Sequence, residues 1–467
     1  MVRESNMEET IGPATKKRSL SIGLQEARAS KKSKKPVRDN RHRYLSFTER
    51  LAEVKVDVLK RTGLDAARTG SLLDEGFDDD YSSHFEQQMA KWGELNLTAH
   101  FTAFLRDVGQ KAASLALLIH NKDEVVDALC RHLVIPESKA VRPLCACLAA
   151  LARDLRTEAY PYFQSKLVPA LLLLLESRDT EQLEEAFSCL AYLFKFLVKF
   201  IVEEFPETFA LLLPALRHRQ WFIRKFSAEV LSYLVRQLPT ESLPDHVETI
   251  LAAAALPDAA PGVRASAHEK TRAELTEGLG LLLFETVRGV QHGFHSRLPI
   301  LIAELLPALD AIPAACLGRH AVFEAFLARA LAHASPEAGP GLLAPLLDAA
   351  DEVLAVPAKE ARTSPTLAAA LRFTAMAVSH RGGSLVGDLG EVLKRLRRAL
   401  SPDVLLHAQA LPEAVSGAAA LATAALLVGA SEQLEALKDS WAPIFTLSDP
   451  ALALAVTARV SEAGKCE

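Results

Sequence analysis

A short pattern recurs four times in this sequence at nearly constant spacing. A residue pair is followed four positions later by a pair that begins with a small residue. The four matches are Val141-Arg142 with Cys145-Ala146, Glu185-Ala186 with Cys189-Leu190, Ile223-Arg224 with Ser227-Ala228, and Val263-Arg264 with Ala267-His268. Their starts are 44, 38 and 40 residues apart, within or close to the roughly 40–47 residues of HEAT and armadillo units. This period predicts an α-solenoid of stacked helical pairs.

The best-defined pair lies within residues 179–238. Apolar and small residues recur at three- and four-residue spacing from Ile223 to Val235, which is typical of an amphipathic helix. Residues 205–216 are expected to form its partner helix, joined to it by the polar link 217–220. Because two such helices cannot bury their apolar faces alone, they require neighbours on both sides. The small residue lets adjacent helices approach closely, and the arginine of the motif is expected to lie along the surface.

Composition supports an all-α chain. The 467 residues are 49% hydrophobic, and no Asn-Gly or Asp-Gly hairpin signal occurs among them. The length alone suggests about three domains, but the core of a solenoid is continuous. The longest apolar run, 167–175, is too short to span a membrane, so no membrane association is expected. The six cysteines are scattered and are expected to be reduced.

The N-terminal residues differ from the remainder in charge. Residues 1–43 carry 12 Lys+Arg and 5 Asp+Glu, a balance of +7, whereas the remaining chain has a balance of −12. This segment lacks apolar periodicity and is predicted to be disordered. Two basic clusters suit the two acidic grooves of a nuclear import adaptor, and they predict a bipartite import signal and a nuclear protein. Its residues are Lys16, Lys17, Arg18, Lys31, Lys32, Lys34 and Lys35. The alternative is a solvated, non-specific basic tail.

Two further regions follow the tail. Residues 44–313 are predicted to form the HEAT-type solenoid, and residues 314–467 to continue it as Ala/Leu-rich helical repeats. Gly278 and Gly280 lack the third glycine of a dinucleotide-binding loop, and we expect them to serve helix packing.

No signature of catalysis is present. The spacing of Gly382 and Gly387 resembles a phosphate loop, but Asp388 stands where such a loop needs lysine and would repel phosphate. His292 and His295 supply only two of the ligands that a zinc site requires. No Gly-x-Ser-x-Gly or His-Glu-x-x-His motif occurs. We therefore expect a protein that is not an enzyme and has no cofactor or metal, although a helical enzyme with a hidden site is a further alternative.

One basic and aromatic cluster stands out within the solenoid. Its candidate contact residues for RNA or a protein partner are Arg217, Arg219, Arg224 and Lys225. Trp221 and Phe222 lie among them, and an arginine beside an exposed aromatic ring can bind a phosphate and stack a base. In the alternative interpretation, both aromatic rings belong to the core and the charges are ordinary solvated turn residues, which are common in such repeats.

Six segments resemble the N-terminal region of the DRIM (down-regulated in metastasis) family. They are 44–58 (YLSFTERLAEVKVDV), 92–108, 151–163, 187–201, 222–238 (FIRKFSAEVLSYLVRQL) and 279–296. Members of this family are very large nucleolar HEAT-repeat scaffolds of the small-subunit processome. The resemblance implies a role in the maturation of 18S ribosomal RNA, with processome proteins, pre-ribosomal RNA and small nucleolar RNA as partners. It covers residues 44–296 and carries over no catalytic residue.

A karyopherin-like transport or cargo-binding adaptor is the alternative function. An acidic solenoid suits basic cargo, but a transport receptor does not normally need a bipartite import signal of its own. Binding to the nuclear transport GTPase would distinguish this adaptor from a ribosome-assembly scaffold.

Overall fold

The computed structural model describes residues 45–51, 83–177, 179–254, 265–308, 316–335, 341–342, 344–346 and 348. The basic tail with its import signal and most of residues 314–467 lie outside this range. The chain divides into two compact units, Met1–Leu45 and Ser46–Glu467, and all that follows concerns the second. Its described residues are α-helices joined by turns, and among them only Arg288 and Phe294 form a β-bridge. The prediction of an all-α helical-repeat solenoid is confirmed.

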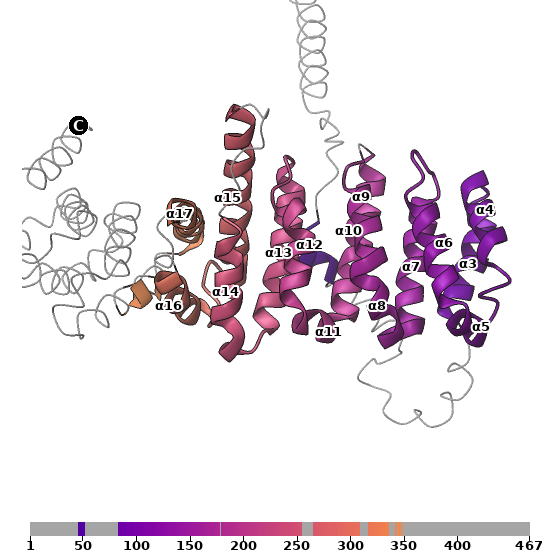
Figure 1. Ribbon diagram of the computed structural model, residues 1–467, viewed down its shortest axis with the longest axis horizontal. Coiled ribbons are helices and arrows are strands. Elements are labelled where there is room, and N and C mark those ends of the chain that lie inside the picture. Colours follow the sequence, from indigo (N-terminus) through magenta and orange to yellow (C-terminus); the bar gives the residue numbers. More distant parts are fainter. Residues whose placement is uncertain are drawn as a thin grey trace, which may run out of the picture. The chain divides into compact units, whose positions relative to one another are not determined.

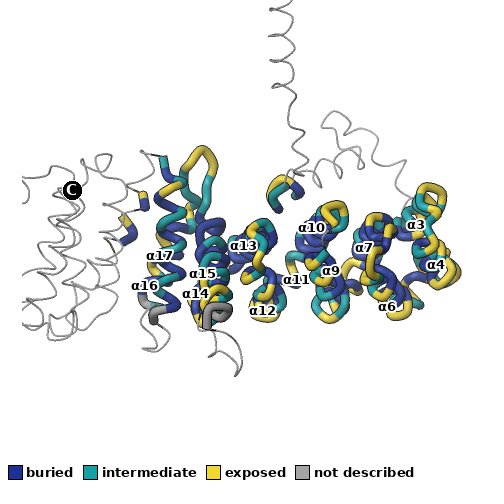
Figure 2. The backbone as a smooth tube through the Cα atoms, turned by 90° about the horizontal axis from the view of Figure 1, so that it is seen from above, coloured by how far each residue is buried: buried dark blue, intermediate teal, exposed yellow. Residues whose placement is uncertain are grey.

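The helices stand side by side in chain order (Figure 1), and seen from above they form two adjoining rows (Figure 2). Their bounds are α3 His84–Leu95, α4 Ala99–Val108, α5 Leu115–His120, α6 Lys122–Leu133, α7 Val141–Leu155, α8 Tyr160–Tyr162, α9 Val168–Leu174, α10 Thr180–Phe196, α11 Val198–Glu203, α12 Phe205–Leu216, α13 Trp221–Gln237, α14 Leu243–Ala252, α15 Ala265–Val287, α16 Leu298–Ala308 and α17 Cys316–His333. One row contains α7, α10, α13, α15 and α17. The other contains α6, α9, α12, α14 and α16, and helices contact mainly their neighbours, as in a solenoid.

The pair at the centre of the sequence argument forms as predicted. Helix α12 has the expected bounds, and residues 217–220 link it to α13. Ile223, Leu231 and Leu234 of α13 are fully buried. Because α13 packs between α10 and α15, it is buried over more than one apolar stripe. In Figure 2 the buried residues follow the facing sides of the helices, and the turns are largely exposed.

Small residues bring the helices close, as the repeat pattern predicts. The Cys189 thiol lies 3.6 Å from the carbonyl oxygen of Cys145, so the motif positions of α7 and α10 face each other. A Cβ on Gly278 would lie 2.1 Å from the Leu216 carbonyl oxygen, and one on Gly280 would lie 2.6 Å from the Ala325 Cβ. Both distances are far below van der Waals contact, so the expected packing role of these two glycines is confirmed.

The motif arginines do not share one environment. The Arg142 side chain is 71% exposed and lies 3.3 Å from a carboxylate oxygen of Glu185, on the surface as predicted. The same prediction is wrong for Arg224, which is 7% exposed. Its guanidinium points inward because it donates to the carbonyl oxygens of His218 and Arg219 and to the carboxylate of Glu277.

One carboxyl group in α13 is buried in an unusual setting. Glu229 is 3% exposed, and its Oε2 accepts the backbone N–H of Phe47 at 2.6 Å. Burial raises the pKa of Glu229 to about 7, against the lowering effect of the Phe47 N–H, and nearby Glu285 raises it further. Lys225 and Arg288 counteract this shift through their positive charges.

Substitution of Gly278 by alanine should strongly destabilise the fold. The new methyl group would force α15 away from the Leu216 backbone, and overpacking of this kind costs about 1–3 kcal/mol or more. Gly93→Ala in α3 is the matched control, because its Cβ would meet only a flexible Leu105 methyl at 3.3 Å. Urea unfolding followed by circular dichroism should show a lower midpoint for G278A alone. Equal midpoints for the two variants would contradict the close approach of α15 and α12.

Substitution of Glu229 by glutamine should stabilise the protein in a pH-dependent manner. The folded-state pKa is raised above the ordinary value of 4.5, so wild-type stability falls as pH rises from about 4.5 to about 7 and then levels off. Glutamine cannot ionise and avoids this loss, on the order of 2–3 kcal/mol above pH 7. Thermal unfolding at pH 5 and pH 8 measures it. Glu94→Gln, at an exposed position in α3, serves as control, and a gain for E229Q that is the same at both pH values contradicts the argument.

Candidate nucleic-acid or partner interface

The turn between α12 and α13 carries the exposed part of the basic and aromatic cluster. Arg217 and Arg219 are exposed, and Trp221, the first residue of α13, is 57% exposed. Phe222 is half-buried, with its ring edge-on to Phe187 at a centroid distance of 6.4 Å. The interpretation that both aromatic rings belong to the core is therefore wrong for Trp221. Two guanidinium groups and an indole ring share this surface.

The buried Arg224 side chain binds the backbone of this turn. Its Nη1 donates to the carbonyl oxygens of His218 and Arg219 at 2.7 and 3.1 Å, and its Nη2 donates to Glu277 Oε2 at 2.5 Å. The carbonyl groups of His218 and Arg219 follow the end of α12 and have no acceptor role within that helix. The Arg224 guanidinium of α13 supplies their hydrogen-bond donor and so caps the turn. Because Arg224 is buried and engaged in this way, its assignment as a contact residue is wrong.

Lys225 also points toward the interior. It is half-buried, and its Nζ lies 3.8 Å from Glu229 Oε1, one helical turn further along α13. The four basic residues of the cluster therefore divide into an outward pair, Arg217 and Arg219, and an inward pair, Arg224 and Lys225. Sequence spacing does not separate these pairs, because the acceptors that bind the inward pair come partly from α15.

Turns of successive repeats lie beside one another and form a ledge, here called the turn ledge, of residues 95–98, 134–140, 176–177, 179 and 217–220. The contacts that join these turns and the adjoining helix start are Asn96 Nδ2 to the Lys139 carbonyl (3.3 Å), Gln182 Nε2 to the Ser138 carbonyl (3.2 Å) and His218 Nε2 to Glu176 Oε1 (3.2 Å). Exposed acidic residues such as Glu137 and Asp179 accompany the earlier turns, whereas the turn 217–220 contains none. The strongest positive charge on the described ledge therefore belongs to the α12–α13 turn.

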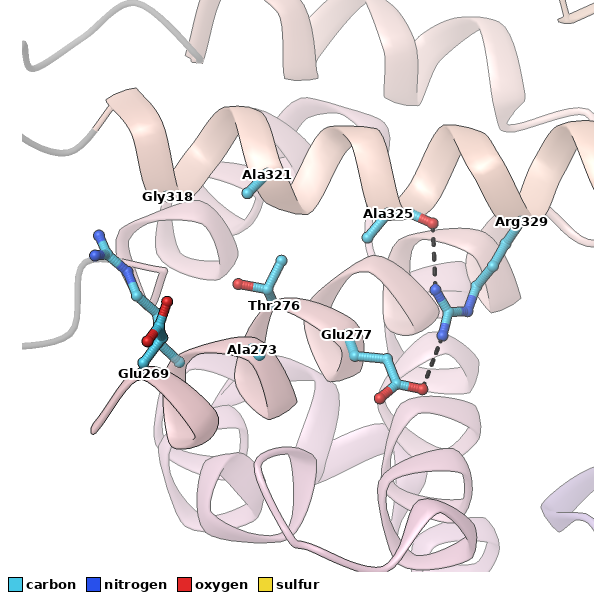
Figure 3. Close-up of a pocket in the computed structure, with 9 residues that line it drawn as sticks. Glu269, Ala273, Thr276, Glu277, Gly318, Ala321, Ala325 and Arg329 are labelled. Atoms are coloured by element: carbon cyan, nitrogen blue, oxygen red, sulfur yellow. Dashed lines mark hydrogen bonds and ion pairs between the residues drawn. The ribbon is translucent and has the colours of Figure 1, made fainter. Parts of the chain in front are cut away.

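A groove of about 520 Å³ lies between α15 and α17 (Figure 3). Small residues of α17, including Ala321 and Ala325, form one wall, and Glu277 of α15 stands opposite. Glu277 Oε1 accepts from Arg329 Nη2 at 3.0 Å while its Oε2 accepts from Arg224, so its charge is already compensated from both sides. None of the lining residues is a histidine, cysteine or serine. The polar side chains that line the groove include the Thr276 hydroxyl and the Glu269 and Glu277 carboxylates.

The sequence positions weighed as metal ligands serve structural roles. His292 Nδ1 lies 3.1 Å from the His333 carbonyl oxygen, and His295 Nδ1 accepts the Arg297 N–H at 3.2 Å. Within the described ranges, no group of three or more His, Cys, Asp or Glu side chains could hold a metal ion. In the same ranges, no helix is long and apolar enough to cross a membrane.

Comparison with known proteins finds two curated relatives. The chain is 28% identical over 269 residues to U3 small nucleolar RNA-associated protein 20 of Saccharomyces cerevisiae, which covers 57% of this chain and 10% of the yeast protein. It is 29% identical over 201 residues to the protein of the same name from Schizosaccharomyces pombe, covering 43% of this chain and 8% of that protein. The chain therefore spans about a tenth of the length of these relatives.

No family model matches the chain. Among solved structures, an engineered protein aligns with 82% of the chain at 14% identity and a TM-score of 0.21, which is too low to bear on the fold.

The division between inward and outward arginines predicts different effects on stability. Arg224→Ala should destabilise the protein by about 1–3 kcal/mol, because the His218 and Arg219 carbonyl oxygens lose their donor and the packing of the buried side chain is lost. Arg219→Ala, two residues from the start of α13, should change stability by no more than about 0.5 kcal/mol. Urea midpoints of the two variants measure the difference. If the urea midpoint of R224A falls no further than that of R219A, Arg224 does not stabilise the turn by capping its carbonyl groups.

Proposed function

We propose that this chain is a non-catalytic HEAT-type scaffold in small ribosomal subunit biogenesis. It belongs, in this proposal, to the DRIM family and acts within the small-subunit processome, where it supports pre-ribosomal RNA processing and 18S ribosomal RNA maturation. The observation that carries the proposal is the similarity over 269 residues to the yeast U3 small nucleolar RNA-associated protein 20. The second yeast relative supports it over 201 residues.

The architecture suits a scaffold. Each helical pair contacts mainly its neighbours, so stacking of pairs produces an extended surface. Such a surface can bind several partners. The groove between α15 and α17 is lined by small side chains, and its Glu277 and Arg329 are ion-paired with each other. These features support binding rather than chemistry.

The partners in this proposal are processome proteins, pre-ribosomal RNA and small nucleolar RNA. The α12–α13 turn is the proposed RNA contact: Arg217 and Arg219 bind phosphate, and the exposed Trp221 indole stacks on an unpaired base. Arg224 supports this contact indirectly by fixing the turn carbonyls.

In this proposal, residues 1–43 direct the protein to the nucleus. A nuclear import adaptor binds the two basic clusters at 16–18 and 31–35, and the protein acts in the nucleus and nucleolus. No membrane is part of this route.

Ultraviolet crosslinking of the tagged chain in cells tests the proposal. Recovered RNA is sequenced, and co-purified proteins are identified. Pre-ribosomal RNA with processome proteins supports the scaffold, whereas the transport GTPase and nuclear-pore proteins without that RNA would support the karyopherin-like adaptor instead.

The double variant Arg217→Glu/Arg219→Glu should lower the yield of crosslinked RNA by roughly three- to tenfold, with a reduced salt dependence, because two phosphate contacts are lost. Lys91→Glu/Arg131→Glu changes the net charge equally at exposed positions on α3 and α6, and it should leave the yield unchanged. Equal losses in both variants would show a general charge effect and contradict a contact at the turn.

A further inference from the structure

The imidazole ring of His218 contacts two turns of the turn ledge. His218 lies between the outward arginines, Arg217 and Arg219, but its own side chain is only 11% exposed. Its Nδ1 accepts the backbone N–H of Gln220 at 3.1 Å, two positions later in the same turn. Its Nε2 lies 3.2 Å from Glu176 Oε1, which belongs to the preceding turn of the ledge. The ring therefore joins its own turn to the preceding repeat.

The hydrogen bond from Gln220 determines where the ring carries its proton. A backbone N–H can only donate, so Nδ1 of His218 must be unprotonated to accept it. The neutral ring then holds its proton on Nε2, beside the carboxylate of Glu176, where a negative charge favours it. The two nitrogens thus differ in function, because Nδ1 binds the turn and Nε2 faces the neighbouring repeat.

Gln220 is the residue at which the backbone enters α13. It is the N-cap of that helix, with φ −86° and ψ 122°, and its own side chain forms no capping hydrogen bond. The bond from its N–H to His218 Nδ1 resembles an Asx turn, in which an Asn or Asp oxygen accepts the N–H two positions later. This bond fixes the extended backbone of the N-cap. It therefore also fixes the direction of the next residue, Trp221, which is 57% exposed.

The carbonyl groups of the same turn are fixed by a different side chain. The His218 carbonyl oxygen accepts from Arg224 Nη1 at 2.7 Å, and the Arg219 carbonyl oxygen accepts from the same nitrogen at 3.1 Å. Arg224 thus binds acceptors of the turn, whereas the His218 ring binds a donor. With the backbone held in both ways, the side chains of Arg217 and Arg219 remain at the surface.

We infer that His218 is the positioning residue of the RNA contact, and that its Nδ1 bond holds the outward arginines and the Trp221 indole in the arrangement that binds single-stranded RNA. This inference rests on the proposed contact at the α12–α13 turn. His218 does not touch the RNA itself, because only 11% of its side chain is exposed. A strand with a phosphate on the arginines and a base on the indole requires a fixed separation between them. Loss of the Nδ1 bond removes this fixed separation although both arginines remain.

Two substitutions separate the functions of the two ring nitrogens. In His218→Asn the side-chain oxygen replaces Nδ1 and accepts the Gln220 N–H, as in an Asx turn, but the side chain is too short to reach Glu176. In His218→Gln the amide nitrogen replaces Nε2 beside Glu176, and the bond to the Gln220 N–H is lost. Both replacements are neutral, so neither adds charge to the turn.

Binding of a fluorescein-labelled single-stranded RNA of mixed sequence to the full-length chain is measured by fluorescence anisotropy. We expect H218Q to bind about three- to tenfold more weakly than wild type and H218N to restore binding to within about twofold. The matched control is His100→Gln, because the Nδ1 of His100 also contacts the turn ledge, 3.1 Å from Ser138 Oγ, and this variant should bind as wild type does. Arg217→Glu/Arg219→Glu gives the affinity that remains without the contact.

Hydrogen–deuterium exchange of residues 217–223 without RNA tests the positioning by itself. The Gln220 N–H should exchange about fivefold faster in H218Q than in wild type, because it has lost an acceptor worth about 1 kcal/mol. H218N should retain the slow exchange. This measurement does not depend on RNA binding, so it remains decisive if the proposed function fails.

The outcomes separate the inference from the proposed function. Faster exchange and weaker RNA binding in H218Q, both reversed in H218N, support the positioning role. Wild-type RNA binding by H218Q, together with a loss in Arg217→Glu/Arg219→Glu, overturns the positioning role and leaves the contact in place.

Two further results also overturn the positioning role. The first is equal exchange of residues 217–223 in wild type, H218N and H218Q. The second is a loss of helical circular dichroism in H218Q, which would show that His218 is required for folding as a whole. If Arg217→Glu/Arg219→Glu binds RNA as tightly as wild type, the proposed contact itself fails, whether or not the exchange result holds.

Discussion

The structure depends on arginines that cap helices other than their own. The last carbonyl groups of a helix have no partner within it, and several of these ends are enclosed by the next repeat. A guanidinium from a neighbouring element supplies the missing donors and also favours the negative end of the helix dipole. The caps are Arg224 on the α12–α13 turn, Arg236 on the end of α15, Arg297 on the end of α13 and Arg319 on Ala308 of α16.

These caps join each repeat to the next by contacts that require one register. Glu277 of α15 receives Arg224 from the preceding repeat and Arg329 from the following one, and Glu248 of α14 pairs with the buried Arg319. In these pairs the Arg224 and Arg319 side chains are buried, whereas the carboxylates are nearly half exposed. Such pairs add little net stability, because desolvation of the guanidinium offsets the attraction. We therefore assign the apolar helix faces to stability and these arginines to the alignment of adjacent repeats.

The difference between apolar packing and arginine contacts explains which features could be predicted from the sequence. The bounds of α12 and the packing roles of Cys145, Gly278 and Gly280 follow from periodicity and residue size, which are local properties. The environment of an arginine is not a local property. The same motif position is exposed in α7, where Arg142 pairs with Glu185, and buried in α13, where Arg224 also donates to two turn carbonyl oxygens. Ser46 and Glu49 form a capping box, which is a local signal that the sequence carries. The bond from the Phe47 N–H to Glu229 joins residues 182 positions apart and could not be predicted in this way.

The candidate binding surface follows from the same constraint. In the α12–α13 turn, Arg224 donates to the carbonyl oxygens of His218 and Arg219, so a residue of the following helix engages these two acceptors. Arg217 and Arg219 consequently project from the surface beside Trp221, which is 57% exposed. An inward arginine thus holds the turn in the conformation that presents the outward pair. On this reasoning the surfaces that a helical-repeat scaffold offers to RNA or protein consist of the side chains that capping and packing leave unused. A change in a buried cap should therefore alter a binding surface that other side chains form.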